Sequence, residues 1–486
     1  MHKVWSVSGR SIAVSALALA LTACQNMRVP EPVAQANLPV QGYLIQSSAP
    51  SIAEEGYKEF FADPRLLQVL DMALTNNRDL RIATLNIQRA QQQYQITQNN
   101  QLPTIGASGG VLRQDTLTTN GAMTNYNVSL GVTAYELDFW GRVRSLKDSA
   151  LDTYLATSSA RDATQISLVG QVAQAWLSYS FSNAQLKLAD QTLKAQLESY
   201  NLNKKRFDVG IDSELPVRQA QISVETARND VANYKTQIAQ AQNLLNLLVG
   251  EPVPANLLPT QRVTRITKSN VMNAGLPSDL LNNRPDIRAS EYQLSAAGAN
   301  IAAAKARLFP TISLTGNAGY ASTSLSDLFK SGGFVWSIGP SIDLPIFDWG
   351  TRQANIKISE TDQQISLSDY EKSIQSAFRE VNDALAVRKN IGDRLAAQRR
   401  LVDATNVTYK LSNARFRAGI DSYLSVLDAQ RTSYSAEQGL LLLEQANMNN
   451  QVEVYKTLGG GVKANTSNTV QKQPSSAELN TMNSPQ

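Results

Sequence analysis

The sequence is almost without histidine and cysteine. It has one of each among 486 residues, His2 and Cys24, and both lie in an N-terminal segment with the features of a secretion signal. Catalysis by Ser-His-Asp or Cys-His groups is therefore excluded, as are nearly all zinc and copper sites. Carboxylates alone remain, and no pattern points to chemistry by them. We predict that the protein is not an enzyme and binds no metal.

An excess of one charge and long apolar segments are also missing. The sequence has 45 basic and 41 acidic residues, which is not the charge distribution of a nucleic-acid-binding protein. Its mean hydropathy is −0.25. No segment reaches the roughly 18 consecutive apolar residues of a membrane-spanning helix, so the sequence predicts none.

The first 24 residues have the pattern of an export signal that ends in a lipidation site. A basic start precedes an apolar run over 12–21, which is too short to span a bilayer. The run ends in Leu21-Thr22-Ala23-Cys24, which resembles the bacterial lipobox, in which the cysteine becomes the acylated first residue. A plain cleavage site with an incidental cysteine is the alternative. Gln25 replaces the aspartate that retains lipoproteins at the inner membrane, so the resemblance implies the outer membrane.

The chain contains a tandem repeat. Between 206–221 and 415–430, ten of sixteen positions are identical. Pro103 and Trp140 recur, in the same order, as Pro310 and Trp349. The predicted organisation is a signal peptide (1–23), a lipidated extension (24–61), a first repeat (62–250), a connector in an equatorial region (251–274), a second repeat (275–460) and a disordered polar tail (461–486).

Each repeat contains one very long segment that favours a helix. The 142–209 segment has no proline and a single glycine, and so does 351–418. Either segment would be about 100 Å long as a continuous helix. Gly210 and Gly419 are predicted to end these helices with positive φ. Asp212 and Ser213, with Asp421 and Ser422 in the second repeat, are predicted to cap the helices that follow.

Four segments alternate between apolar and small polar residues, namely 104–112, 126–137, 311–321 and 334–346. In the second of them, Val128, Leu130, Val132 and Ala134 are predicted to share the apolar face. The segments have about the length that a tilted strand needs to cross a bilayer. A soluble antiparallel sheet with one hydrated face is the alternative. Membrane barrels begin at about eight strands, and lipid does not tolerate open sheet edges, so a barrel requires several chains. Three copies would supply twelve strands.

Aromatic residues cluster where the strands lead into the long helices: Tyr135, Phe139, Trp140, Phe347 and Trp349. A girdle at the membrane interface is one interpretation. Packing at a strand-to-helix corner is the other, and the two are compatible.

Several motifs together resemble the TolC family of outer-membrane efflux ducts, in its lipidated, OprM-like (NodT-type) branch. They are the lipobox, Leu137–Arg142, Asn283–Arg288, Phe309-Pro310 and Gly419–Arg431. The resemblance implies an α+β membrane protein that forms a homotrimer. A twelve-stranded antiparallel β-barrel in the outer membrane would continue into a long α-helical barrel across the periplasm. A periplasmic adaptor and an inner-membrane pump of the resistance-nodulation-division type would deliver drugs and other small molecules. No cofactor is implied beyond the covalent lipid on Cys24.

The resemblance also assigns a gate. Leu424 and Asp428 are four residues apart and share one helix face, and matching positions of the OprM-like branch constrict the periplasmic end. Arg431 is predicted to pair with Asp428 or with a neighbouring chain. The alternative for Asp428 is an exposed acid favoured by the helix dipole. The first repeat has Leu215 and Gln219 at these positions, so the acid belongs to one hairpin only.

The two turns are predicted docking points for the adaptor: Val209-Gly210-Ile211 and Ala418-Gly419-Ile420. The alternative is that they are merely well-formed turns. The segments 114–125 and 322–333 would then be extracellular loops.

Two other functions compete with the drug-efflux duct. One is a TolC-type duct for type I protein secretion, and the other is a lipidated structural or adhesive coiled coil without a channel. Lipidation favours efflux over secretion, and the alternating strands and the repeat oppose the coiled coil.

Overall fold

The computed structural model describes residues 51–115, 121–268, 273–275 and 279–460 and divides into two units. Unit 1 comprises Asn86–Ser158 and Ala289–Lys372. Unit 2 comprises Ser159–Arg288 and the described parts of Pro39–Leu85 and Ser373–Gln486. The predicted signal peptide, Cys24 and the polar tail lie outside the described residues.

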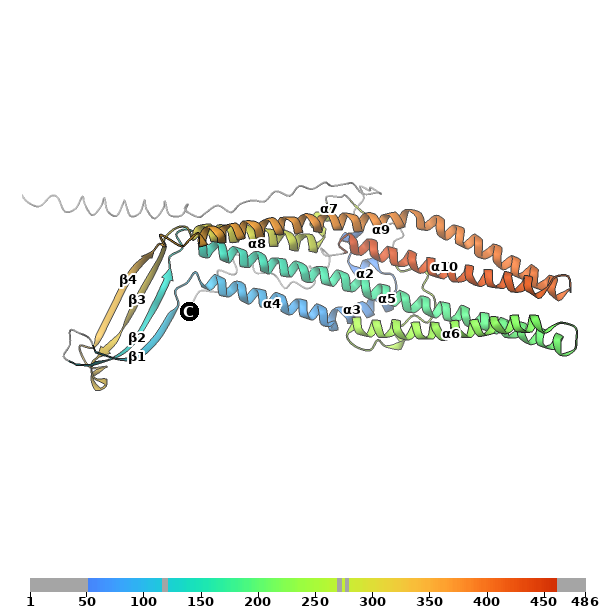
Figure 1. Cartoon of the computed structure of the whole chain (residues 1–486), viewed down its shortest axis with the longest axis horizontal. Coiled ribbons are helices and arrows are strands. Elements are labelled where there is room, and N and C mark those ends of the chain that lie inside the picture. The colour runs from blue at the N-terminus through green and yellow to red at the C-terminus, as the bar shows by residue number, and fades with distance from the viewer. Residues whose placement is uncertain (1–50, 116–120, 269–272, 276–278, 461–486) are drawn as a thin grey trace, which may run out of the picture. The chain divides into compact units, whose positions relative to one another are not determined.

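Both repeats contain the same series of elements (Figure 1). The series is a helix, two strands, a helix of 67 residues, a tight turn and a further long helix. The order from the strands onward is the predicted one. The first repeat has α4 (Arg78–Asn99), β1 (Ile105–Gln114), β2 (Met123–Glu136), α5 (Arg142–Asp208) and α6 (Glu214–Val249). The second has α8 (Pro285–Ala306), β3 (Thr311–Ser322), β4 (Phe334–Asp343), α9 (Thr351–Arg417) and α10 (Tyr423–Thr457). Short helices complete the chain: α2 (Tyr57–Phe60), α3 (Pro64–Asn76) and α7 (Asp279–Asn283), with 3-10 turns η1 (Ile52–Glu54), η2 (Ala255–Leu257) and η3 (Leu325–Asp327).

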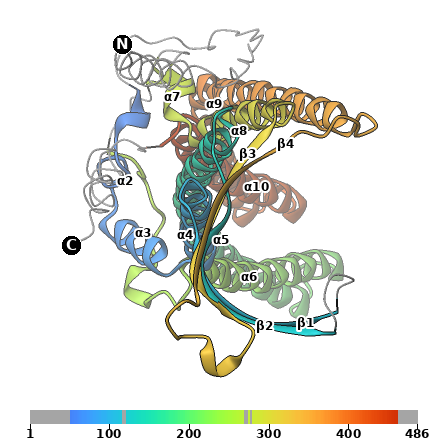
Figure 2. The ribbon, with the colours of Figure 1, turned by 90° about the vertical axis from the view of Figure 1, so that its left-hand side faces the viewer.

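Unit 1 contains a four-stranded antiparallel sheet with the order β1-β2-β3-β4 (Figure 2). Leu130 lies opposite Ala107 on one side and Ala318 on the other, so apolar residues of adjacent strands share one face. Small polar residues share the other face, where Ser108 bonds to Ser129 at 3.0 Å and Ser313 to Ser341 at 2.8 Å. The sheet therefore has one apolar and one polar face, as the alternation predicts.

One predicted position on the apolar face is wrong. Val132 pairs with Gly316 and Tyr135 with Leu314, so Thr133 and Ala134 together face Thr315. This β-bulge puts Ala134 at a φ of 50° and places Tyr135, instead of Ala134, opposite Leu314. The sequence alternation runs on through the bulge, which is why the pattern gave no sign of it.

The turns between the long helices differ from prediction in their caps. Gly210 and Gly419 have φ values of 74° and 73°, as predicted. In the first turn, the amide of Ile211 donates to the carbonyl of Arg206 and that of Gly210 to Phe207, both at 2.9 Å, which is the Schellman pattern.

The predicted side-chain caps are wrong. Ser213 and Ser422 occupy the N-cap positions, but neither side chain accepts a capping hydrogen bond. Asp212 instead accepts from Arg206 Nε at 2.8 Å, and Asp421 from Arg415 Nε at 2.7 Å. Each acid thus ties its turn back to the preceding helix, because a guanidinium offers a charge-assisted partner.

The core of unit 2 joins the connector to α5. Trp176 is fully buried, and its indole N–H donates to the carbonyl of Leu257 at 3.1 Å. The amide of Val263 donates to the Ser180 hydroxyl at 3.0 Å. The connector is therefore folded along the helix through hydrogen bonds that satisfy buried polar groups.

We expect Gly250→Ala to destabilise unit 2. Gly250 ends α6 with a φ of 83°, and a Cβ there would lie 2.5 Å from the carbonyl oxygen of Asn76 in α3. The left-handed conformation alone costs an L-residue about 1–2 kcal/mol, and the overlap adds to it. Gly392→Ala is the matched control, since a Cβ at this helical position meets no atom within 4 Å. It should stabilise the helix by about 0.5–1 kcal/mol. Thermal unfolding in detergent measures both, and equal effects would contradict the proposed packing.

Candidate gate and docking surface

The hairpin ends of unit 2 are open to solvent. Val209, Ile211 and Ile420 are 69%, 67% and 64% exposed. A Cβ at Gly210 or Gly419 would meet no atom within 4 Å. Ala418 is exposed as well. The six residues predicted for docking therefore form two small apolar tips without a partner among the described residues.

Below these tips the two hairpins pack together. The buried cluster contains Ala220 of α6, Phe416 of α9 and three residues of α10, Tyr423, Val426 and Leu427. The Arg206 guanidinium of α5 lies 5.3 Å from the centre of the Phe416 ring. A cation–π contact and a small apolar core thus hold the hairpin ends side by side.

The three predicted gate residues share the outward face of α10. Leu424, Asp428 and Arg431 are all exposed, whereas Val426 and Leu427 face the cluster. Among the described residues no ion pair joins Asp428 to Arg431, and the pairing of Arg431 with a neighbouring chain stays a prediction.

Leucine exposure does not distinguish the two hairpins. Leu215 of α6 is 63% exposed and its repeat equivalent Leu424 is 58% exposed. The hairpins differ in charge, because Gln219 stands where α10 carries Asp428.

A pair of hydrogen bonds between α6 and α10 was not foreseen from the sequence. The Tyr434 hydroxyl donates to Asp230 Oδ2 at 3.0 Å, and Gln438 Nε2 donates to the Tyr234 hydroxyl at 3.0 Å. Each helix contributes two side chains one turn apart, so the bonds form a two-rung clasp. Burial, followed by the charge of Asp230, raises the pKa of both tyrosines above the usual value.

The aromatic residues at the strand-to-helix junctions divide into two groups. The indole N–H of Trp140 donates to the carbonyl of Pro310 at 2.7 Å, and the Tyr135 hydroxyl donates to that of Gln101 at 2.8 Å. Phe139, the residue before Trp140, is half-buried as well. Phe347 and Trp349 are 87% and 99% exposed. The first group packs at a corner, and the second projects from unit 1.

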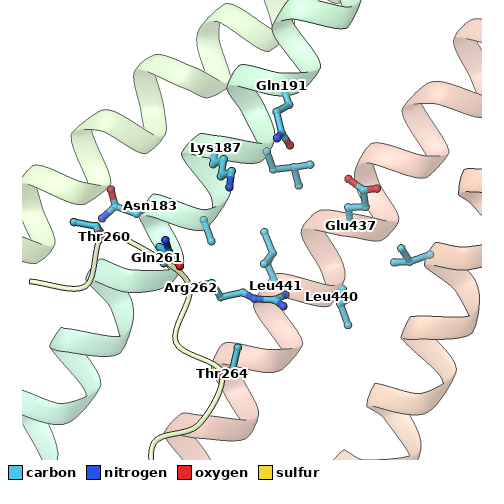
Figure 3. Close-up of a pocket in the computed structure, with 13 residues that line it drawn as sticks. Asn183, Lys187, Gln191, Thr260, Gln261, Arg262, Thr264, Glu437, Leu440 and Leu441 are labelled. Carbon is cyan, nitrogen blue, oxygen red and sulfur yellow. The ribbon is translucent and has the colours of Figure 1, made fainter. Parts of the chain in front are cut away.

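Unit 2 also contains a pocket of about 610 Å³ (Figure 3). Its lining comes from α5, the connector, α9 and α10, and includes Lys187, Arg262 and Glu437. Arg262 is held by Glu444 at 2.7 Å, and Glu437 accepts from Asn406 at 3.0 Å. The lining contains no histidine, cysteine or serine.

Nowhere in the described part of the chain do three His, Cys, Asp or Glu residues gather in a group that could hold a metal ion. None of the described helices has a stretch long and apolar enough to cross a bilayer.

Comparison with known proteins identifies a family. The family model of outer membrane efflux proteins matches residues 69–251 and 276–460. The antibiotic efflux pump outer membrane protein ArpC of Pseudomonas putida is 44% identical over 422 residues, which are 86% of this chain and 87% of that protein. The cation efflux system protein CusC of Escherichia coli is 38% identical over 455 residues, covering 92% and 98%.

A solved structure has the same fold. The open state of the Neisseria gonorrhoeae MtrE outer membrane channel superposes with a TM-score of 0.83 and 37% identity, covering 90% of this chain and 98% of that one. The predicted TolC-like fold is confirmed by this likeness and by the four-stranded antiparallel sheet.

We expect Tyr434→Phe to loosen the clasp between α6 and α10. The substitution removes the hydroxyl that donates to Asp230 and keeps the ring, so it should cost about 1–2 kcal/mol of unfolding free energy. Tyr200→Phe is the control, because Tyr200 packs against the hairpin cluster and no hydrogen bond of its hydroxyl is seen in the described part of the chain. Urea unfolding in detergent compares the two, and an equal loss would assign the effect to packing.

Proposed function

Because the chain belongs to the outer membrane efflux protein family, we propose that three copies form the exit duct of a tripartite efflux pump. The family consists of outer-membrane channels and not of enzymes. The observation that supports several copies is the sheet of unit 1, which has one apolar face and two strands at its edges, and the number three is what the family resemblance implies. Lipid does not tolerate such edges, and twelve strands from three chains close a barrel. The serine, threonine, asparagine and glycine face would then line the lumen.

The partners of this duct are a periplasmic adaptor and an inner-membrane pump of the resistance-nodulation-division type. The exposed tips, residues 209–211 and 418–420, are the surfaces for the adaptor. Isoleucine stands on both exposed turns, Ile211 and Ile420, and buries little apolar area within the chain, which favours a docking role over a merely structural one. The duct needs no energy source, since the pump supplies the driving force.

The cargo we propose is drugs and other small molecules. The name of one relative specifies antibiotics and that of another specifies cations, so family membership alone leaves the cargo open. The absence of histidine after residue 2, together with one cysteine at 24, leaves no imidazole and no free thiolate along the duct to bind transition metals, so methionine thioethers are the soft ligands that remain. That composition favours organic molecules.

The N-terminus adds a lipid anchor in this proposal. Signal cleavage after Ala23 and acylation of Cys24 place the mature chain in the lipidated, OprM-like branch. Several acyl chains would anchor the N-terminus firmly, at about 0.8 kcal/mol per buried CH₂. We also propose the domain boundaries that the sequence predicts, namely a first repeat over 62–250 and a second over 275–460 with a connector between them.

We propose Leu424 and Asp428 as the periplasmic gate, with Arg431 as a link to the neighbouring copy. Their exposure on one face of α10 is compatible with two rings around a threefold axis. A leucine ring excludes water and ions, and an acidic ring repels anions and attracts cations.

Deletion of the gene tests the function. We expect antibiotics and fluorescent dyes to accumulate in the deletion strain and to return to wild-type levels when the chain is restored. Ile211→Ser with Ile420→Ser should leave trimers in the outer membrane yet fail to restore export, because the tips lose their apolar surface. Ile222→Ser, at an exposed position of α6 away from the tips, is the matched control and should restore it. Unchanged accumulation together with a loss of secreted proteins would indicate type I secretion.

The gate assignment predicts a conductance change. Leu424→Ala with Asp428→Ala should raise the conductance of the trimer in planar bilayers severalfold, because both rings become wider. Leu215→Ala with Gln219→Ala changes the equivalent positions of the first hairpin and should have a smaller effect. Equal conductance of the wild type and the Leu424/Asp428 variant, with trimers intact, would place the gate elsewhere.

A further inference from the structure

The two tryptophans of the repeat have opposite environments. Trp140 precedes α5 and Trp349 precedes α9, each followed by a glycine with positive φ. Trp140 is half-buried, whereas Trp349 is 99% exposed. Equivalent residues of a repeat are expected to have equivalent surroundings, so the contact that Trp140 makes within the chain is missing at Trp349.

Trp140 packs on the segment that leads into β3. Its ring stacks on Phe309 with centroids 4.7 Å apart and planes 17° apart, and its N–H donates to the Pro310 carbonyl. This contact fastens the end of β2 to the start of β3, the strand beside it.

Trp349 is held in position, and no ring contact of its indole is seen among the described residues. Asp348 accepts from the amides of Gly350 and Arg352 at 3.1 Å and from Arg352 Nε at 2.6 Å, which fixes the turn. Trp349 itself has a φ of 55°, a conformation unfavourable for an L-residue by about 1–2 kcal/mol. A strained backbone and a fully exposed indole stabilise nothing within one chain.

The repeat contains the missing surface on its other edge. Phe309-Pro310-Thr311-Ile312 before β3 recurs as Leu102-Pro103-Thr104-Ile105 before β1. Leu102 is 65% exposed and Pro103 is exposed. Trp349 and Leu102 therefore stand at the two edge strands, β4 and β1, as Trp140 and Phe309 stand at the inner strands β2 and β3.

We propose that Trp349 of one copy packs over Leu102 of the next copy and donates its N–H to the carbonyl of Pro103 there. The partner is a second copy of this chain, because its Leu102-Pro103-Thr104-Ile105 segment is the repeat equivalent of the segment on which Trp140 packs within the chain. The proposal rests on the oligomeric duct proposed above and specifies how its seam is formed.

The repeat also fixes the register of this seam. Ser129-Leu130-Gly131 of β2 recurs as Ser337-Ile338-Gly339 of β4. Leu130 of β2 pairs with Ala318 of β3. Val111 of β1 is the repeat equivalent of Ala318, because the spacing from Ile105 to Val111 is the same as the spacing from Ile312 to Ala318. Ile338 of β4 should therefore lie opposite Val111 of the next copy's β1.

The faces of the strands agree with this register. Val111 lies opposite Tyr126, and Ile338 lies opposite Gly316, which in turn lies opposite Val132. Val111 and Ile338 thus belong to the same apolar face, and a slip by one residue would place them on opposite faces. Every residue of β1 and β4 is exposed in the single chain, so both edges are free to pair.

Cysteine cross-linking in membranes tests the register. Ile338→Cys with Val111→Cys should form disulfides between chains and give a covalent trimer on denaturing gels. Ile338→Cys with Gly109→Cys shifts one partner by two residues on the same face and should form far less, because diagonal neighbours are about 7–8 Å apart. Leu130→Cys with Ala318→Cys is the equivalent pair within one chain and should form a disulfide without a covalent trimer. Single variants show any background from Cys24.

Each result decides the proposal. Covalent trimers from the Ile338/Gly109 pair instead of the Ile338/Val111 pair would overturn the register. If neither pair gave covalent trimers while the Leu130/Ala318 pair formed its disulfide, the seam itself would be overturned.

Trp349→Ala should lower the temperature at which uncross-linked trimers dissociate by several degrees, and Trp349→Phe, which keeps the ring, by less. Equal stability of wild type and Trp349→Ala would remove the tryptophan from the seam. Cross-linking is scored without export, so covalent trimers in a chain that exports nothing would refute the duct and keep the seam.

Discussion

The structure depends on one constraint, which is that a strand in lipid has no water to satisfy its backbone amides and carbonyls. Each chain supplies four strands and leaves β1 and β4 at the edges. The β2–β3 pairing joins the two repeats within a chain. In the proposed trimer, β4–β1 pairing would join repeats of different chains, and six repeats would meet at junctions of one kind. Association would then be a condition for the fold of unit 1 in a membrane.

The sequence predicts the elements well where a local property determines them. Long stretches without proline and almost without glycine predict α5 and α9, and strict alternation predicts β2, β3 and β4, each to within three residues at either end. It fails where a tertiary contact decides. Ala134 is displaced from the apolar face by a bulge opposite Thr315. The aspartate and serine side chains expected to cap α6 and α10 make no capping hydrogen bond from the N-cap position, and the aspartates pair with arginines of the preceding helices instead.

The same distinction holds for the candidate site. Gly210 and Gly419 are identifiable because a left-handed turn restricts the residue type. The gate residues come from a family resemblance, and the structure adds that they share an exposed face. The clasp of Tyr434 with Asp230 could not be predicted, since both residue types are ordinary on a polar helix face. Only the packing of two hairpins brings together side chains 204 residues apart.

The difference between the two hairpins bears on how such a gate would open. In a trimer, Asp428 would give three carboxylates near the axis, whereas Gln219 would add none, so half of the hairpin ends carry the charge. Arg431 lies on the same face and forms no ion pair with Asp428 among the described residues, and in the proposed gate it would pair with the carboxylate of a neighbouring copy. An exposed pair of this kind contributes at most about 1 kcal/mol. In the proposed gate, three such pairs and a leucine ring would hold the closed state only weakly. The binding energy of an adaptor at the tips would then be enough to reverse it, provided that the adaptor binds the open state more tightly, since a partner shifts an equilibrium only by its differential affinity for the two states.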